Sequence, residues 1–307
     1  TGSAGTSVFG NADNVIFNNN GIFNINVGTI TFRGQGDHAG LFNIPSGSAL
    51  RFEQNNTIVH NFNIGSSVQG SGSVSFLNGT NNFNNGSSYA STLVTNHTNG
   101  RVNWNAASVS INDYTFTSGI EEGSGILNII QTLTWSGGEW RGSGQTVLAS
   151  GANGFFNAAD KVLSEGRLFT NNGNISWTGG NIRSCSGGHF SNNGFLSITN
   201  DNSFLSFCSG NAGITVSNAG TIEKTSNGTS TFNTFSSCSN TGSLKGIGTY
   251  SFENTSLAQN GIIAPGNPIG ILAINGAQPL SANSTLQIDF INGSGTGTGH
   301  VQLTISG

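Results

Sequence analysis

A short phrase recurs along this chain, and it restricts the possible folds more than any other feature. The phrase is Asn-Asn-Gly, or a looser copy of it, followed by a short apolar segment. The copies lie at 19–21, 98–100, 171–175, 192–196, 218–222, 240–244 and 259–263. From residue 173 to residue 261, successive glycines are 21, 26, 22 and 19 residues apart. Such a period indicates a solenoid.

A second phrase repeats at a compatible distance. Trp-Ser-Gly-Gly-Glu-Trp-Arg at 135–141 returns as Trp-Thr-Gly-Gly-Asn-Ile-Arg at 177–183, displaced by 42 residues, or two coils of 21. Phe156 lies midway between the first residues of the two copies. We therefore expect Trp135, Phe156 and Trp177 to stack at one position of three successive coils.

The repeat has a physical explanation in the way coils share a core. One coil of short strands cannot bury its own apolar side, whereas stacked coils form a continuous narrow interior. In each copy the residue two after the glycine is apolar, and it is expected to point inward. These residues are Phe23, Val102, Ile175, Leu196, Ile222, Leu244 and Ile263. Asn and Gly tolerate positive φ, and Asn can bond its neighbouring backbone, so Asn-Gly is expected to form the corner.

The repeat length sets the expected size of the architecture. At about 22 residues per coil the chain holds roughly 13–14 coils of about 19–26 residues. Parallel stacking is favoured because two-residue hairpin turns are not the dominant signal. The competing architecture is an antiparallel β-sandwich pair. By motif, we divide the chain into a repetitive solenoid over 1–258 and C-terminal coils over 259–307, continuous with it.

Composition excludes several classes of protein. The chain has 47 Gly and only 34% hydrophobic residues, but its 21 Phe recur in alternating runs, which are typical of strands and not of disorder. The net charge of −4 leaves no basic stripe for nucleic acid. No apolar stretch approaches the roughly 20 residues that span a bilayer, so we expect no membrane insertion. The chain opens at Thr1 without a signal-peptide pattern, which suggests a mature fragment of a longer protein.

The C-terminal region carries the most specific motif. Gly-Ile-Ile-Ala-Pro-Gly-Asn-Pro-Ile-Gly at 261–270 continues as Ile-Leu-Ala-Ile-Asn-Gly at 271–276, and two strands are expected at 284–290 and 302–307. This resembles the closing motif of autotransporter-like passenger domains and adhesin-type β-helices of bacterial surface proteins. Val301 departs from it, because that family usually places Asp before the Gln-Leu pair. The resemblance implies a right-handed parallel β-helix, adhesion or display as its work, and a secreted or cell-surface location.

Few residues suggest catalysis, and we expect a protein that is not an enzyme and needs no cofactor or metal. The only adjacent carboxylate pair, Glu121-Glu122, is interpreted as a solvated turn. Asp113, Glu139 and Asp160, at intervals of 26 and 21, could form an acidic ladder, although unrelated surface acids are the favoured interpretation. A carbohydrate-binding or polysaccharide-cleaving β-helix is therefore the alternative function.

A possible binding platform comes from aromatic and arginine side chains. Sugars lie on indole faces and Arg can donate two hydrogen bonds at once, so Trp140, Arg141 and Arg183 are the predicted binding residues if they face outward. Trp140 is the tryptophan expected to be exposed, and the other three are expected in the core. The partners would be a glycan or a host or cell-surface ligand, and end-to-end self-association is a further expectation.

Three cysteines lie at 185, 208 and 238. The 23 residues between Cys185 and Cys208 are close to one coil, and stacked coils bring equivalent Cα atoms to roughly 4.8 Å, which a disulfide can bridge. A Cys185–Cys208 bond and a small buried cysteine ladder both remain open. Together these features predict a structural or adhesive stalk.

Overall fold

The computed structural model describes residues 5–10, 15–53, 55, 57–207, 213–233, 235–252, 254–276 and 280–306. Every regular element in these ranges is a β-strand, and the sheets are parallel and stacked as a β-solenoid of about 13 turns. The predicted all-β parallel solenoid is confirmed. By packing, the chain divides into unit 1, Thr1–Ala149, and unit 2, Ser150–Gly307. The division at 258/259 rests on sequence motif and stays a prediction.

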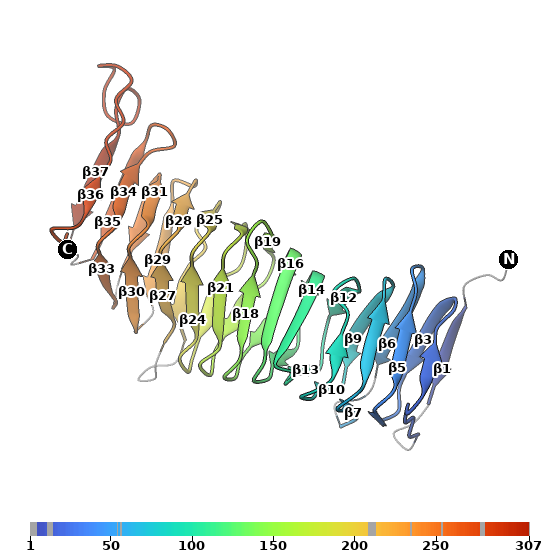
Figure 1. Cartoon of the computed structure of the whole chain (residues 1–307). Helices are drawn as coiled ribbons and strands as arrows, with labels where there is room; N and C mark the ends of the chain where they lie inside the picture. The colour runs from blue at the N-terminus through green and yellow to red at the C-terminus, as the bar shows by residue number, and fades with distance from the viewer. Residues whose placement is uncertain are drawn as a thin grey trace. The chain divides into compact units, whose positions relative to one another are not determined.

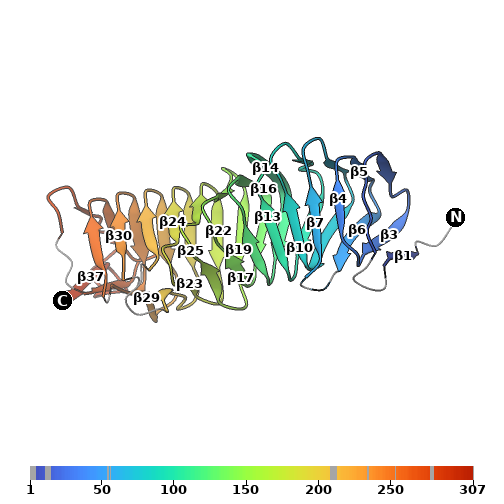
Figure 2. The same cartoon turned by 90° about the horizontal axis from the view of Figure 1, so that it is seen from below.

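Unit 1 contains three stacks of parallel strands, blue to green in Figures 1 and 2. The first stack is β1 (Thr6–Phe9), β3 (Gly28–Phe32), β6 (Ser48–Glu53), β9 (Ser73–Asn78), β12 (Val94–His97), β14 (Ser108–Phe116), β16 (Ile126–Trp135) and β18 (Gln145–Leu148). The second stack is β4 (Gly36–His38), β7 (Val59–Phe62), β10 (Thr80–Phe83), β13 (Arg101–Trp104), β15 (Ile120–Glu122) and β17 (Gly138–Trp140). The third stack is β2 (Ile22–Asn24), β5 (Leu41–Ile44), β8 (Ser67–Gly70) and β11 (Ser88–Tyr89).

Unit 2 also has three strands in most coils, green to red in Figures 1 and 2. The first stack is β19 (Asn153–Phe156), β22 (Asn174–Trp177), β25 (Phe195–Ile198), β28 (Thr221–Lys224), β31 (Ser243–Gly246), β34 (Ile262–Pro265) and β36 (Thr285–Leu286). The second stack is β21 (Leu168–Asn171), β24 (His189–Asn192), β27 (Thr215–Asn218), β30 (Ser237–Asn240) and β33 (Ser256–Gln259). The third group is β20 (Lys161–Leu163), β23 (Ile182–Ser184), β26 (Phe204–Ser206), β29 (Thr229–Asn233), β32 (Gly248–Ser251), β35 (Ile271–Asn275) and β37 (Gln302–Ser306).

The core of unit 1 is a set of aromatic columns that run from coil to coil. The rings of Phe62 and Phe83 are stacked with centroids 4.4 Å apart, and Phe83 stacks on Trp104 at the same distance. In the first stack, Phe52 lies between the rings of Phe32 and Phe76 at 5.9 and 5.6 Å. Because each ring fills the space between two coils, no single coil could form this core alone.

The predicted inward positions are largely correct. Six of the seven side chains are 2% exposed or less, and Phe23 is half-buried. Those six are Val102, Ile175, Leu196, Ile222, Leu244 and Ile263. Phe156 and Trp177 lie in register on β19 and β22, and both are fully buried as predicted. Trp135 is also fully buried and lies in register with Phe116 within unit 1.

Gly100, in the copy of the phrase at 98–100, has the predicted positive φ, 76°. Four later glycines of the phrase, in unit 2, are needed for another reason. Gly194, Gly220, Gly242 and Gly261 do not have positive φ. Instead, a Cβ atom on each would lie only 2.0–2.2 Å from the carbonyl oxygen of the glycine one coil earlier. Stacking at this distance excludes every side chain, so close backbone approach, not the turn conformation, requires the glycine.

The residue two positions before each glycine of the phrase in unit 2 carries a side-chain amide, and these amides form a buried ladder. Each side-chain amide donates to the amide oxygen one coil later: Asn171 to Asn192 at 2.7 Å, Asn192 to Asn218 at 2.7 Å, Asn218 to Asn240 at 2.6 Å, and Asn240 to Gln259 at 2.9 Å. The steps of 21, 26, 22 and 19 residues are those of the sequence repeat. Asn171 also accepts the Gly173 N–H at 3.0 Å, which is the predicted bond to neighbouring backbone. The repeat therefore encodes an axial hydrogen-bond ladder.

The C-terminal motif forms coils of the same kind. The expected strand at 302–307 is present as β37, whereas only Thr285 and Leu286 of 284–290 form a strand, β36. Val301, the departure from the family motif, is 4% exposed, and its side chain lies against Gly266. The valine that stands where the family motif has Asp is thus an apolar residue in the core.

Candidate functional site

Outward side chains of the second stack in unit 1 form the most elaborate polar surface. One column places Val59, Thr80, Arg101, Ile120 and Glu139 at equivalent positions of successive strands. A neighbouring column places Asp37, Asn61, Asn82, Asn103 and Glu122 two residues further along each strand. We call these the Arg101 column and the Asn82 column. Alternation along β-strands brings both to the same face.

The Asn82 column is an external amide ladder. Asn61 donates to Asp37 at 2.8 Å, Asn82 donates to Asn61 at 2.7 Å, and Asn103 donates to Asn82 at 2.6 Å. Each of these three amides keeps a second N–H bond for other partners. The column therefore presents polar groups at the spacing of the coils, about 4.8 Å.

A charge cluster continues this surface. Glu122 forms ion pairs with the Arg101 guanidinium and, at 2.7 Å, with Arg141, while Arg141 lies 3.9 Å from Glu139. Hydrogen bonds from both arginines hold the pKa of the Glu122 carboxyl below its usual range, although burial opposes them. Two positive and two negative groups cancel, so this charge cluster is polar without net charge.

A cavity of about 470 Å³ lies beside the Arg101 column. It is lined by Gly79, Thr80, Asn99, Gly100, Arg101, Ser118, Gly119 and Ile120. Its three glycines all have left-handed φ, between 73° and 94°, and lie at the corners of successive coils. A Cβ on Gly100 or Gly119 would lie 2.5–2.6 Å from the backbone of the preceding coil, so glycine lets these corners stack closely, and bare backbone forms part of the wall of an open trough. We call it the glycine trough.

The three predicted binding residues differ in burial and in their contacts. Trp140 is fully buried, with its ring centroid 4.2 Å from that of Trp135, so the expectation that it is exposed was wrong. It lies in register with Glu121, on an inward position of β17. Arg141 is partly exposed and belongs to the charge cluster, and its binding role stays a prediction. In unit 2, Arg183 is partly exposed and pairs with Asp160 at 2.8 Å.

The prediction of a solvated Glu121-Glu122 turn was also wrong. The pair lies on β15, where Glu122 faces outward and Glu121 is fully buried. Inside the coil, Glu121 lies 3.0 Å from His97 Nδ1 and accepts the Tyr114 hydroxyl. Both His97 and Tyr114 are at most 1% exposed, so this polar cluster has no access to a substrate and we assign it a structural role.

A second buried polar pair was missed in the sequence. His38 and His60 lie fully buried on β4 and β7, with His38 Nε2 2.8 Å from His60 Nδ1. The Asn19 N–H donates to His38 Nδ1 at 3.2 Å, so Nε2 must carry the proton of that ring. Burial lowers the pKa of His38 to about 4, and burial together with His38 lowers that of His60 to about 3. The 22-residue spacing of the two histidines was the available signal.

The conceivable acidic ladder is not formed within unit 1. Asp113 lies on β14 in the first stack, in register with Val94 and Thr132. Glu139 lies on β17 in the second stack. Asp160, in unit 2, accepts the Asn181 N–H at 2.7 Å as well as pairing with Arg183. Glu139 and Asp160 each have an arginine partner of their own, Arg141 and Arg183.

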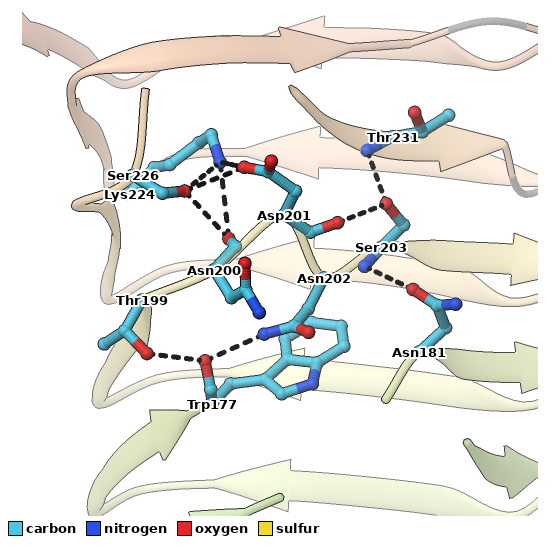
Figure 3. Close-up of polar contacts among 10 residues, drawn as sticks. All are labelled: Trp177, Asn181, Thr199, Asn200, Asp201, Asn202, Ser203, Lys224, Ser226 and Thr231. Atoms are coloured by element: carbon cyan, nitrogen blue, oxygen red, sulfur yellow. Dashed lines mark hydrogen bonds and ion pairs between the residues drawn. The ribbon is translucent and has the colours of Figure 1, made fainter. Parts of the chain in front are cut away.

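Unit 2 contains a lysine clamp, drawn in Figure 3. The Lys224 side chain is fully buried, and its ammonium donates to Asp201 at 2.8 Å, Ser226 at 2.5 Å and the Asn200 carbonyl at 3.3 Å. The hydrogen bonds that Asp201 accepts from Lys224 and from the Ser226 hydroxyl hold the pKa of its carboxyl below the usual range. With three N–H bonds donated, the lysine has no lone pair to accept the Ser226 proton. The cluster therefore fastens a loop.

The same loop is fastened on its other side. The Asn202 amide donates to the Trp177 carbonyl at 2.9 Å, and Ser203 N–H donates to Asn181 at 3.0 Å (Figure 3). Ser203 Oγ in turn accepts the Thr231 N–H at 2.9 Å. The loop that connects β25 to β26 is thus held from the coil before it and the coil after it.

The cysteines are only partly described. Cys185 is disulfide-bonded. Its predicted partner, Cys208, lies outside the described residues. Cys238 is a buried thiol on β30, 3% exposed, in register with Val216 and Leu257. The Cys185–Cys208 pairing stays a prediction.

Within the described ranges, no group of three or more His, Cys, Asp or Glu is arranged to hold a metal ion. The described chain also contains no helix of the length and apolar character that crossing a membrane requires. No protein family, no curated protein and no solved structure matches the chain.

Proposed function

We propose that this chain is a structural and adhesive stalk segment of a secreted or cell-surface bacterial protein, which acts by display, adhesion or self-association. The observation that carries the proposal is the buried amide ladder from Asn171 to Gln259, because it joins every coil it crosses to the next. Within unit 1, the aromatic columns likewise run from coil to coil. A chain whose interior groups bond along the stack is suited to resist force along it.

The resemblance of residues 261–276 to autotransporter-like and adhesin-type β-helices supports the location and the adhesive part of the proposal. The outward faces agree with it, since they carry amide ladders and balanced ion pairs and not a single strong charge. Such a surface can present repeated contacts to a glycan or to another copy of the chain, including an end-to-end copy.

Single-molecule pulling between the two termini tests the stalk. We expect unfolding in many small steps, each releasing roughly 70 Å of chain for a coil of about 21 residues. Asn192→Leu should lower the force of the steps that include its coil. Asn193→Leu should not, because the Asn193 residue is exposed and its side-chain amide donates to Asn172 outside the buried ladder. One low-force event that unravels the whole chain would argue against a stalk.

Retention under flow tests the adhesive part. Beads coated with the chain should remain on a glycan-coated or host-cell surface at a shear that removes beads coated with heat-denatured chain. Equal loss of both kinds of bead would contradict adhesion and would leave display or self-association to be examined by light scattering of the soluble chain.

A further inference from the structure

We propose that the glycine trough of unit 1 is a saccharide-binding site that takes an uncharged oligosaccharide. The inference deepens the adhesive function proposed above by naming its ligand class. The volume of the trough, about 470 Å³, lies in the range of small-ligand sites, roughly 300–1,000 Å³. The trough crosses three coils, which repeat at about 4.8 Å, close to the length of one pyranose unit.

The lining groups match the two sides of a sugar ring. Hydroxyl groups of Thr80 and Ser118, the Asn99 amide and the Arg101 guanidinium provide both donors and acceptors for sugar hydroxyls. Ile120, at the same position as Arg101 one coil later, offers apolar contact for the C–H face. The three glycine corners contribute bare backbone to the wall of the trough.

The pairing of positive and negative side chains at the trough favours an uncharged sugar over an anionic one. The only charged side chain that lines the described trough, Arg101, is ion-paired with Glu122. Glu122 is also held by Arg141, and its pKa stays below the usual range, so it remains negative at neutral pH. An acidic sugar would have to compete with this carboxylate for the guanidinium, whereas a hydroxyl can accept one of its remaining N–H bonds.

A steric variant with a matched control tests the site. Ser118 is exposed at the rim, so Ser118→Trp should fill the trough, and Ser124→Trp places the same side chain at an exposed corner outside it. Isothermal calorimetry of the whole chain would use cellotetraose, maltotetraose, chitotetraose and tetragalacturonic acid as probes. We expect at least one uncharged probe to bind and S118W to weaken it by about tenfold or more, with S124W binding as the parent chain does.

A charge variant provides the second measurement. Arg101→Ala should weaken the same probe by about tenfold, and Arg33→Ala, which removes a similar but more exposed Arg–Glu pair with Glu53, should not. Circular dichroism with unchanged thermal midpoints shows that the variants are folded. A variant that loses its fold is replaced by Thr80→Val, which removes only a hydroxyl from the wall.

The possible outcomes separate this inference from the adhesive function. Binding of tetragalacturonic acid alone, binding that S118W leaves unchanged, or no binding of any probe would overturn the saccharide site. If coated beads still adhere in those cases, adhesion stands and uses another surface. If an uncharged probe binds as expected while beads fail to adhere, the site is supported and the adhesive function is the part that fails.

Discussion

At the scale of single residues, the unusual feature is that ionisable side chains are placed inside narrow coils. His38 and His60 are held neutral by burial, and the acceptor and donor arrangement of Asn19, His38 and His60 fixes one tautomer. Both pKa values, about 4 and about 3, lie below the 6.5 of an unfolded histidine. As pH falls, the unfolded chain therefore takes up protons first, and stability is lost from pH 6.5 downward.

We expect the free energy of unfolding of unit 1 to fall by up to about 1.4 kcal/mol per pH unit for each histidine between pH 6.5 and pH 4. His60→Gln keeps an acceptor for His38 but cannot titrate, so its pH dependence should be clearly shallower. Urea midpoints by tryptophan fluorescence measure this, since three of the four tryptophans lie in unit 1. The exposed His189→Gln is the control, and equal slopes for H60Q and the parent chain would refute the assignment.

The lysine clamp gives a second prediction at the residue scale. Lys224→Met removes the group chiefly responsible for the low pKa of Asp201, so that pKa should rise toward its ordinary value. Carboxyl chemical shifts in an NMR titration report it directly. Lys245→Met, which removes the partner of Glu223 at 3.2 Å, should leave the Asp201 titration unchanged.

At the scale of the coil and its strands, one corner of unit 2 contains two neighbouring asparagines, one buried and one exposed. Asn192 is buried, accepts from Asn171 and donates to Asn218 and the Thr221 carbonyl. Its neighbour Asn193 is exposed and donates to Asn172 at 3.0 Å. A buried group that loses its partner bears the full cost of desolvation, whereas an exposed one returns to water.

Asn192→Leu should therefore destabilise unit 2 by about 3 kcal/mol, because it leaves the Asn171 donor and the Asn218 acceptor buried and unmatched. Asn193→Leu should cost less than about 1 kcal/mol. Chemical denaturation followed by circular dichroism compares the two. Equal costs would mean that the ladder contributes nothing beyond packing.

Glycine at the corners should be equally strict. A Cβ at Gly220 would lie 2.0 Å from the Gly194 carbonyl oxygen, so Gly220→Ala forces the two coils apart and should cost about 3 kcal/mol. Gly293, also in unit 2, has nothing within 4 Å of such an atom, and Gly293→Ala should be nearly neutral. Thermal midpoints of the two variants decide the matter, and a neutral G220A would show that the corner can relax.

At the scale of the whole molecule, stability is spread over many contacts between neighbouring coils. A strand of one coil pairs with strands of the next and the previous coil, as β25 does with β22 and β28. Damage at one coil should therefore act on its neighbours first and weaken with distance along the stack. This behaviour distinguishes a solenoid from a globular domain that unfolds as one body.

Hydrogen exchange tests this expectation. In Asn192→Leu, amide protection should fall most in β24, β25, β27 and β28 and remain at the parent level in β3, β6 and β9 of unit 1. The conservative surface variant Asn193→Leu provides the reference exchange pattern. A uniform loss of protection along the chain would contradict nearest-neighbour stability.

The sequence determined the period, the parallel coils and the inward positions, because these depend on spacing alone. The 21-, 26-, 22- and 19-residue steps reappear unchanged as hydrogen bonds between Asn171, Asn192, Asn218, Asn240 and Gln259. What the sequence alone misassigned was the role of those groups. The sequence predicts that the asparagine forms a turn and that the glycine adopts positive φ. In the stack, the asparagine amide donates to the next coil, and the glycine leaves room for the backbone of the preceding coil.

Tertiary structure alone decided which side chains of β15 and β17 face out. A shift of one residue in strand register moves a side chain to the opposite face. Glu121 was expected in a solvated turn and Trp140 on the surface, but the strand register places both in the inward column of Val102. The glycine trough and its ion pairs depend on this local register. They therefore became visible only once the coils were stacked, since contacts between side chains about 20 residues apart are set by where each strand begins.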